Sequence, residues 1–284
     1  MKISVIISTY NQPEWLAKVL HGYLCQTHKD FEIVIADDGS DARTREVIER
    51  FGRKTDLQVR HVWHPDNGFQ KSRILNMAVV ESTGDYLVFT DGDCIPRKDF
   101  VAAHVAHASP STFLSGGYCK LPMELSQRIT PEDIGTGRAF KISYLRSNGL
   151  RGFSQTLKIG MPEWLRPVMD SITPRKATWN GCNSSTWKSA ILAVNGHNEE
   201  MQYGGQDREM GERLVNSGLL ARQIQHRAIL LHLDHKRSYK TPESIMKNRA
   251  IRQQVIASGS VWCENGIVKG PAAGHSAQSY QADS

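Results

Sequence analysis

Two aspartates separated by one glycine, Asp91-Gly92-Asp93, follow the apolar run Tyr86-Leu87-Val88-Phe89. Carboxylates at this spacing reach one ion together, or divide between an ion and a ribose hydroxyl. Mg²⁺ and Mn²⁺ prefer oxygen ligands and commonly join protein carboxylates to substrate phosphates. Gly92 removes side-chain bulk where a diphosphate must approach. An ordinary acidic turn is the alternative, but the position after an apolar strand favours a site for a metal and a phosphate.

A second acidic pair, Asp37-Asp38, also follows a predicted strand, residues 31–36. Parallel strands present their carboxyl ends at one edge of a sheet, so we expect both acidic pairs on the same rim. A nucleotide accounts for so many acids, because one carboxylate accepts from a base N–H or a ribose hydroxyl while a metal neutralises the others. For Asp38, a turn residue or a helix cap is the alternative.

Lys71 and Arg73 lie at the start of an expected helix, after the turn Asn67-Gly68. Cationic side chains and free backbone N–H groups at a helix start both favour a phosphate. Solvated surface charge is the other interpretation of these two residues.

The C-terminal part of the chain adds a carboxylate and two imidazoles. Asp207 opens a helix after Gly204-Gly205, where its carboxylate is either held beside a substrate or serves only as a helix cap. His235 follows an apolar strand and is a candidate metal ligand through a neutral imidazole. A structural role is the alternative for His235, and His232 leaves the choice between the two histidines open.

These residues require a sheet to position them. Short strands are predicted at residues 3–8, 31–36, 57–62 and 86–90, alternating with helices at 13–27, 42–51 and 71–80. This alternation predicts an α/β fold with one doubly wound, mostly parallel sheet flanked by helices. Residues 109–177 are less regular, with one helix near 133–145. A helix at 187–194, a helix from 207 with Met210, Leu214 and Val215 on one face, and a strand at 228–231 follow.

Composition limits the class of protein. The 284 residues are 39% hydrophobic and 23% charged, as in globular proteins. No apolar run approaches the roughly 20 residues of a membrane span, and the start does not read as a signal peptide, so we expect a cytoplasmic protein. Five cysteines without a CxxC pair suit reduced thiols. The net charge of +6 is interpreted as spread along the chain and does not indicate nucleic acid. Residues 270–284 are expected to be disordered.

Taken in order, the motifs resemble family-2 glycosyltransferases with the GT-A fold. The segment from Val5 to Asn11, Gln26, the segment from Ile35 to Ser40, Asn67-Gly68 with Arg73 and Asn76, and Gly84-Asp85-Tyr86 before Asp91-Gly92-Asp93 match that family's donor half. Residues 181–214 are similar to the galactosyltransferase-type acceptor segment. Gln206 stands where the family usually has Glu, and His197 and Asn198 stand where Phe and Asp are commoner.

The resemblance implies a role for each matching residue. Asp207 is the catalytic base, Asp93 and His235 bind Mn²⁺ or Mg²⁺, and Asp91 contacts ribose or the donor sugar. The donor site is implied to hold Ser8, Thr9, Tyr10, Asn11, Asp37, Asp38, Asn67, Lys71, Arg73 and Gly92, and the acceptor or donor-sugar site Trp179, Asn180, Gly181, Gly205 and Gln206.

The implied reaction transfers a sugar with inversion from a UDP-sugar to a hydroxyl of a glycan or lipid-linked glycan, in bacterial surface polysaccharide or lipopolysaccharide assembly. We expect one GT-A domain over residues 1–269, with a donor half (1–115), an acceptor and catalytic half (116–235) and a C-terminal extension (236–269). Lys158, Trp164, Leu165 and Arg166 indicate peripheral contact with the cytoplasmic membrane face, with interior packing of Trp164 as the alternative.

Two other functions are alternatives to sugar transfer. Sugar nucleotidyltransferases usually need a glycine-rich phosphate loop after the first strand, and the segment from Ser8 to Asn11 lacks one. A catalytically silent nucleotide-sugar binder does not need a base, so the joint presence of Asp93, Asp207 and His235 argues against it.

Overall fold

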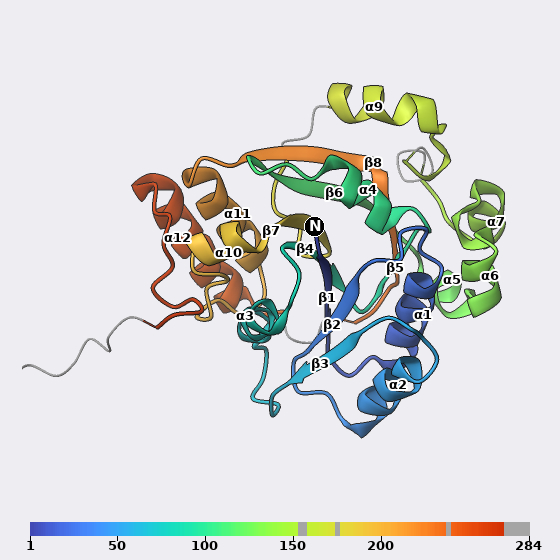
Figure 1. Ribbon diagram of the computed structural model, residues 1–284, viewed down its shortest axis with the longest axis horizontal. Helices are drawn as coiled ribbons and strands as arrows, with labels where there is room; N and C mark the ends of the chain where they lie inside the picture. Colours follow the sequence, from blue (N-terminus) through green and yellow to red (C-terminus); the bar gives the residue numbers. More distant parts are fainter. Residues whose placement is uncertain (153–157, 174–176, 237–239, 270–284) are drawn as a thin grey trace, which may run out of the picture.

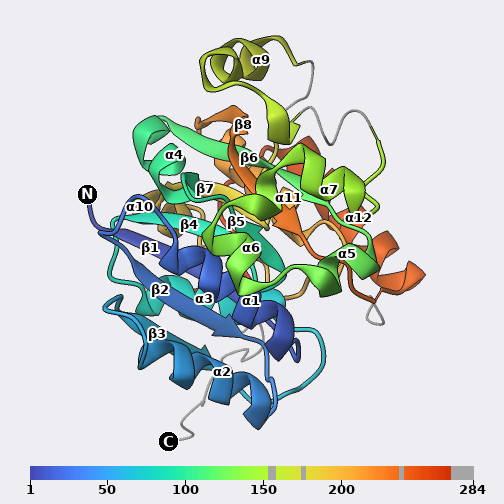
Figure 2. The same ribbon diagram turned by 90° about the vertical axis from the view of Figure 1, so that its right-hand side faces the viewer.

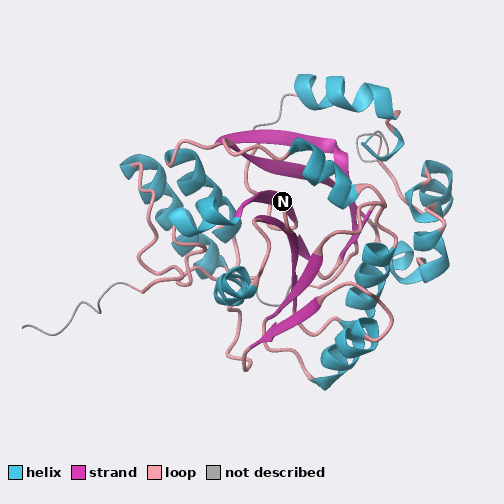
Figure 3. Ribbon diagram, in the orientation of Figure 1, coloured by secondary structure: helices cyan, strands magenta, loops and turns pink. Residues whose placement is uncertain are grey.

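The computed structural model describes residues 1–152, 158–173, 177–236 and 240–269. Its centre is an eight-stranded sheet within these residues, in the order β3-β2-β1-β4-β7-β6-β8-β5, and the sheet curls as it crosses the molecule (Figures 1 and 3). The strands are β1 (Ile3–Thr9), β2 (Glu32–Asp37), β3 (Val59–Trp63), β4 (Tyr86–Asp91), β5 (Cys94–Pro96), β6 (Thr112–Lys120), β7 (Asn183–Trp187) and β8 (Leu220–His232).

The first four strands form the parallel part of the sheet. β1 pairs in parallel with β2 and with β4, and β2 pairs in parallel with β3. The register places Thr9 beside Asp37 and Ser8 beside Asp91. Both predicted acidic pairs therefore follow strands that end at the same rim, as expected from the sequence.

The second part of the sheet is mixed. β7 lies antiparallel between β4 and β6, β6 runs parallel to β8, and β5 pairs antiparallel with β8. The pairing of β6 with β8 shifts register at Gly116/Gly117. β8 is far longer than the predicted strand at residues 228–231, because its first half alternates exposed and half-buried residues rather than forming an apolar run.

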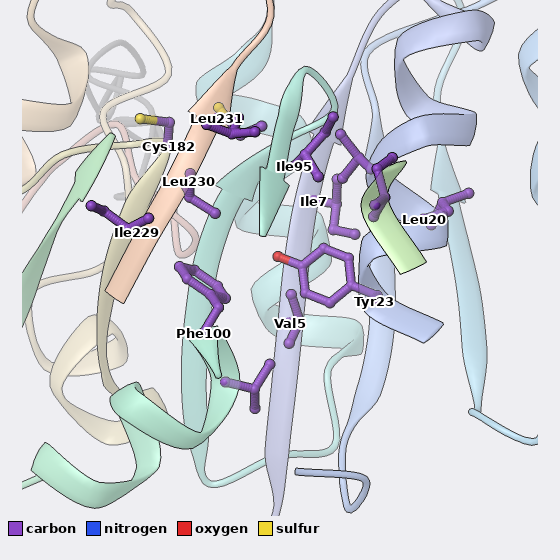
Figure 4. Packing of buried hydrophobic residues seen from close by; sticks show 14 of the residues in the cluster. Val5, Ile7, Leu20, Tyr23, Ile95, Phe100, Cys182, Ile229, Leu230 and Leu231 are labelled. Carbon is purple, nitrogen blue, oxygen red and sulfur yellow. The ribbon is translucent and has the colours of Figure 1, made fainter. Parts of the chain in front are cut away.

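Helices cover both faces of the sheet (Figure 2). Ile3, Val5 and Ile7 of β1 belong to a core shared with α1, α2 and α4, while Ile6 belongs to a second core shared with α3, α10 and α11. Figure 4 shows the first core, where Tyr23 and Phe100 make an edge contact at 6.4 Å between ring centroids. The helices are α1 (Pro13–Leu24), α2 (Ala42–Gly52), α3 (Lys71–Glu81), α4 (Phe100–His107), α5 (Met123–Arg128), α6 (Pro131–Gly135), η1 (Arg138–Phe140), α7 (Ile142–Ser147), η2 (Glu163–Leu165), α9 (Arg166–Ile172), α10 (Lys188–Ala193), α11 (Gln206–Asn216) and α12 (Pro242–Ser258).

The predicted fold class is confirmed, and several predicted elements are corrected. The helix expected near residues 133–145 is three short pieces, α6, η1 and α7, because Gly137 adopts a left-handed conformation (φ 74°) between the first two. The helix expected to reach residue 27 ends at Leu24. Val215 is 49% exposed and not on the buried face of α11.

No helix among the described residues is long and apolar enough to cross a membrane. The predicted tail, residues 270–284, lies outside the described residues.

Candidate active site

A cleft of about 460 Å³ opens at the carboxyl ends of β1 and β4 and is closed on its other side by α11 and the ends of β6 and β8. It unites residues that the sequence separates by more than two hundred positions. The predicted site residues that line it are Ser8, Thr9, Tyr10, Asp38, Lys71, Asp91, Gly92, Asp93, Asn180, Gln206, Asp207 and His235.

Asp91, the last residue of β4, is fixed by two neighbours. Its Oδ1 accepts a hydrogen bond from Ser8 Oγ at 2.7 Å and lies 2.6 Å from Lys71 Nζ. Burial disfavours the charged form of Lys71, but the carboxylates of Asp91, Asp207 and Asp93 outweigh it and raise the pKa of Lys71. The ammonium group is therefore firmly charged at the floor of the cleft, where it suits an anionic ligand.

Gly92 keeps the turn after β4 close to β1. A Cβ atom on Gly92 would lie 2.9 Å from Thr9 Oγ1 and 3.2 Å from Ser8 O. Its own N–H donates to Ser8 O at 2.7 Å. Any larger residue would push Asp91 and Asp93 away from the first strand.

Two histidines converge on the second aspartate of the pair. Asp93 Oδ2 lies 2.9 Å from His235 Nε2 and 3.9 Å from His232 Nε2, and the two imidazole rings are stacked with centroids 5.9 Å apart. Burial opposes ionisation of Asp93, but the hydrogen bond from His235 and the charges of both imidazoles lower its pKa to about 2.

The imidazoles are oriented as metal ligands. Nδ1 of His232 lies 2.9 Å from the carbonyl oxygen of Leu233, and Nδ1 of His235 lies 2.9 Å from that of Lys236. Because a carbonyl only accepts, each Nδ1 carries a proton, so Nε2 is the ring nitrogen that faces Asp93: it donates to the carboxylate in the charged ring and offers a lone pair to a metal in the neutral ring. One carboxylate and two imidazoles fit a divalent ion such as Mn²⁺ better than Mg²⁺, which prefers oxygen ligands. The structure thus brings both candidate histidines together, with His235 the nearer.

Asp207 reaches the cleft from the first turn of α11. A Cβ atom on Gly181 would lie 2.4 Å from the Asp207 carboxylate, so only glycine leaves room for it there. Asp207 Oδ1 is buried and has no hydrogen-bond partner among the described residues. Burial raises the pKa of Asp207, the cation of Lys71 opposes the rise, and Asp91 adds to it. A helix cap would bond to its own helix, and this carboxylate instead faces the cleft.

Asp38 occupies the donor rim beyond β2. Its Oδ2 accepts from the backbone N–H of Gln70 at 3.1 Å, and its Oδ1 lies 3.1 Å from His64 Nε2. Burial raises the pKa of Asp38 to about 6, although Gln70 and His64 both favour the ionised form.

Several predicted donor residues lie outside the cleft. Asp37 is buried, with Oδ1 accepting from Ser40 N–H and Oδ2 lying 2.9 Å from His61 Nε2, so it shapes the turn after β2. Asn11 has φ 47° and accepts from the N–H of Asp41, which also gives it a role in the turn. Asn67 and Arg73 are exposed and do not line the cleft.

Three predicted acceptor residues serve the cleft indirectly. Trp179 is 1% exposed and packs on Phe89 and Phe113, so it is a core residue that cannot stack on a sugar in this conformation. Gly205 adopts φ 96° before α11, and Gly181 makes room for Asp207, but neither lines the cleft.

The cleft also contains residues that were not predicted. Tyr118 and Lys120 lie at the end of β6, a strand that the sequence pattern did not reveal. Phe69 and Tyr203 form an edge contact, with ring centroids 6.0 Å apart. No helical or strand-like repeat of apolar residues in the sequence marked the positions of Phe69 and Tyr203. The remaining unpredicted lining residues are Gln12, Gly68 and Cys182.

The sequence of the chain was compared with protein-family models. The model of glycosyl transferase family 2 matches residues 4–149, slightly more than half of the chain. The chain belongs to this family. A second model, the N-terminal domain of galactosyltransferase, matches residues 171–236 and supports the similarity expected for the acceptor segment.

Relatives of this family 2 member match between about a third and most of its length. An uncharacterized glycosyltransferase of Nostoc sp. is 37% identical over 100 residues, covering 34% of this chain and 30% of that protein. The glycosyltransferase YfnE of Bacillus subtilis is 26% identical over 279 residues, covering 88% and 69%. Hyaluronan synthase of Pasteurella multocida is 34% identical over 105 residues, covering 37% and 11%. The matches to the Nostoc and Pasteurella proteins thus span less than a third of those relatives.

Solved structures confirm the GT-A fold. The mannosyltransferase PcManGT of Pyrobaculum calidifontis, in complex with GDP-Man and Mn²⁺, has a TM-score of 0.55 at 17% identity, covering 90% of this chain and 72% of that one. Residues 1–349 of Staphylococcus aureus TarS, in complex with UDP-GlcNAc, have a TM-score of 0.56 at 17% identity, covering 91% and 71%.

Proposed function

We propose that the protein transfers a sugar from a nucleoside diphosphate sugar, a UDP-sugar, to a hydroxyl group of a glycan or glycolipid, with inversion and with the help of a divalent metal. The observation that carries the proposal is the convergence of Asp91, Asp93 and Asp207 around Lys71 in one cleft, with a buried oxygen of Asp207 left unpartnered.

The donor half supplies groups suited to a nucleotide diphosphate. Asp38 and Ser8 offer hydrogen bonds for a base and a ribose, and Tyr10, which is 42% exposed, offers an aromatic face. Lys71 holds Asp91 and provides a cation for the diphosphate. Gly92 lets the phosphates approach the backbone.

Asp93 and His235, with His232 beside them, would hold the metal. A bound Mn²⁺ would neutralise the negative charge that develops on the departing diphosphate. The fixed Nδ1 protons of the two histidines keep their Nε2 atoms directed at Asp93.

Asp207 would remove the proton from the acceptor hydroxyl as the hydroxyl oxygen attacks the anomeric carbon. The bond from that carbon to the donor phosphate breaks in the same displacement, so the configuration inverts. An ionised carboxylate with a free oxygen is a suitable base, and burial raises its pKa and its proton affinity. General-base assistance of this kind contributes roughly 10²–10⁴-fold to a rate.

The acceptor class is proposed from relatives. Two similar bacterial proteins are named as a hyaluronan synthase and as a poly(ribitol-phosphate) β-N-acetylglucosaminyltransferase, TarS, which is 32% identical over 101 residues. One name describes the synthesis of a polysaccharide, and the other describes the transfer of N-acetylglucosamine to poly(ribitol-phosphate). They support a role in bacterial surface polysaccharide or lipopolysaccharide assembly.

A hydrolysis screen tests the function. Purified protein is incubated with UDP-, GDP- and dTDP-sugars, with Mn²⁺, with Mg²⁺ or with a chelator, and the release of nucleoside diphosphate is measured. We expect slow release from a UDP-sugar with Mn²⁺, and none from the Asp93→Ala variant. Formation of a nucleoside triphosphate and a sugar 1-phosphate when pyrophosphate is added would instead indicate nucleotidyl transfer, and binding without any release would indicate a silent binder.

A further inference from the structure

A row of large apolar side chains faces outward along η2 and α9. Trp164 is 77% exposed, Val168 is 50% exposed and Ile172 is 63% exposed. The three residues are spaced by four, so they share one face of the helix. Figures 1 and 2 show α9 at the outer margin of the molecule, beyond β8 and away from the other helices.

The opposite side of α9 is tied to the body of the protein. Asp170 lies 2.8 Å from Nδ1 of His226 and 3.1 Å from Nε of Arg227, both on β8. Arg166 lies 3.3 Å from Asp99 and donates to the carbonyl of Met161. These contacts orient the helix, and they leave the row of Trp164, Val168 and Ile172 on the outside. Because Arg166 is engaged inward, the outward face differs from the one predicted from the sequence.

Positive charge is concentrated in the same segment. Residues 141–176 contain seven Lys and Arg against two Asp and Glu, a net charge of +5, whereas the whole chain carries +6. The expectation that charge is spread along the chain was therefore wrong. Of the two acids, Asp170 is engaged with β8, while Lys141 and Arg151 are exposed.

We propose that the face formed by Trp164, Val168 and Ile172 docks onto a lipid bilayer that contains anionic headgroups. Trp is suited to the boundary between headgroups and acyl chains. Basic residues near an anionic surface contribute about 1 kcal/mol each to attraction. A second copy of the chain is a poorer occupant, because a symmetric contact would bring two positively charged segments together: the described residues 141–152 and 158–173 contain five Lys and Arg against two Asp and Glu. The docking does not depend on the proposed transfer activity.

Sedimentation with vesicles tests the proposal. The full chain is mixed with vesicles of phosphatidylcholine alone, or of phosphatidylcholine with phosphatidylglycerol, at low and at high salt. We expect binding to the anionic vesicles that weakens with salt. The triple variant Trp164→Ser, Val168→Ser, Ile172→Ser should lose at least about tenfold in vesicle affinity. Lys141→Glu with Arg151→Glu should weaken binding to anionic vesicles only.

The matched control changes exposed apolar residues elsewhere. Met246 and Ile256 of α12 are 71% and 59% exposed, and their replacement by Ser should leave vesicle binding unchanged. Circular dichroism confirms that each variant is folded. The proposal would be overturned by no binding of the wild-type chain, by equal binding of the triple variant, or by a dimer in solution that the triple variant converts to a monomer. Binding to an acidic protein in place of anionic vesicles would overturn it as well.

Discussion

The two walls of the cleft hold their carboxylates in different ways. On the donor wall, formed by the ends of β1, β2 and β4, Asp38 and Asp91 each accept a hydrogen bond from a neighbouring residue. Oδ1 of Asp38 accepts no hydrogen bond from the described residues, but it lies 3.1 Å from Nε2 of His64. Asp37 lies behind this wall and accepts from Ser40 N–H. On the opposite wall, Asp207 has a buried oxygen with no hydrogen-bond partner in the described part of the chain. The donor wall is arranged for stable binding, whereas the α11 wall keeps one group available for reaction.

The two kinds of carboxylate should also contribute differently to folding stability. A buried acceptor without a partner costs about 1–3 kcal/mol of folding stability. We therefore expect the buried carboxylate of Asp207 to lower folding stability, and Asp38, whose pKa burial raises, to do the same in its ionised form. The fully partnered carboxylate of Asp37, behind the donor wall, is expected to raise stability. A variant of Asp207 should therefore lower the transfer rate, whereas a variant of a partnered carboxylate should lower the free energy of unfolding.

The largest expected effect is on the α11 wall. Asp207→Asn keeps the shape of the side chain but removes the proton acceptor, so the transfer rate should fall by roughly 10²–10⁴-fold while donor affinity stays nearly normal. Turnover with a matched acceptor, and calorimetry with the nucleoside diphosphate, measure the two quantities. Turnover close to that of the wild-type protein would show that Asp207 is not the base.

Behind the donor wall, in the turn after β2, the expected effect is on stability. Asp37→Ala leaves Ser40 N–H and His61 without their partner, so it should lower the free energy of unfolding by about 1–3 kcal/mol. Chemical denaturation measures the change, and Asp207→Asn should show no such loss. The contrast between the walls fails if the two variants are equally destabilised.

The pH dependence of activity tests whether the cation of Lys71 lowers the pKa of Asp207 on the opposite wall. The base must be ionised, so activity should fall as pH drops through the pKa of Asp207, which burial raises. Lys71→Gln removes a cation that opposes this rise, so the acid limb of the kcat/KM profile should move to higher pH. Arg73→Gln, on the same helix but outside the cleft, is the matched control. An unmoved acid limb in Lys71→Gln would contradict the coupling.

The smallest expected effect concerns Gln206, which stands beside the base. Its Oε1 accepts from Gly204 N–H at 2.9 Å, which leaves its amide N–H₂ as the group to donate to a substrate. Gln206→Glu turns that donor into an acceptor, so we expect a change in preference among sugars and acceptors, with kcat on the preferred substrate reduced only a few fold. Competition assays with paired substrates measure it, and unchanged preference would remove Gln206 from the specificity contacts.

The site residues that come directly after a buried parallel strand could be predicted from the sequence. The strands before Asp37-Asp38 and Asp91 contain the apolar runs 33–36 and 86–89, so both the strands and the shared rim could be predicted. β6 carries Gly116 and Gly117 at a register shift, and half of β8 alternates in exposure, so neither had a clear pattern. Tyr118 and Lys120 were missed for that reason. Trp179 was misplaced because a buried aromatic beside a motif looks the same in sequence as a sugar-stacking one.

The metal centre at Asp93 is the central claim, and calorimetry of UDP binding with and without Mn²⁺ tests it most directly. The wild-type protein, Asp93→Ala and Asp207→Asn are compared at one pH. We predict Mn²⁺-dependent binding for the wild-type protein and for Asp207→Asn, and loss of the Mn²⁺ dependence in Asp93→Ala. Unchanged Mn²⁺-dependent affinity in Asp93→Ala would contradict the account.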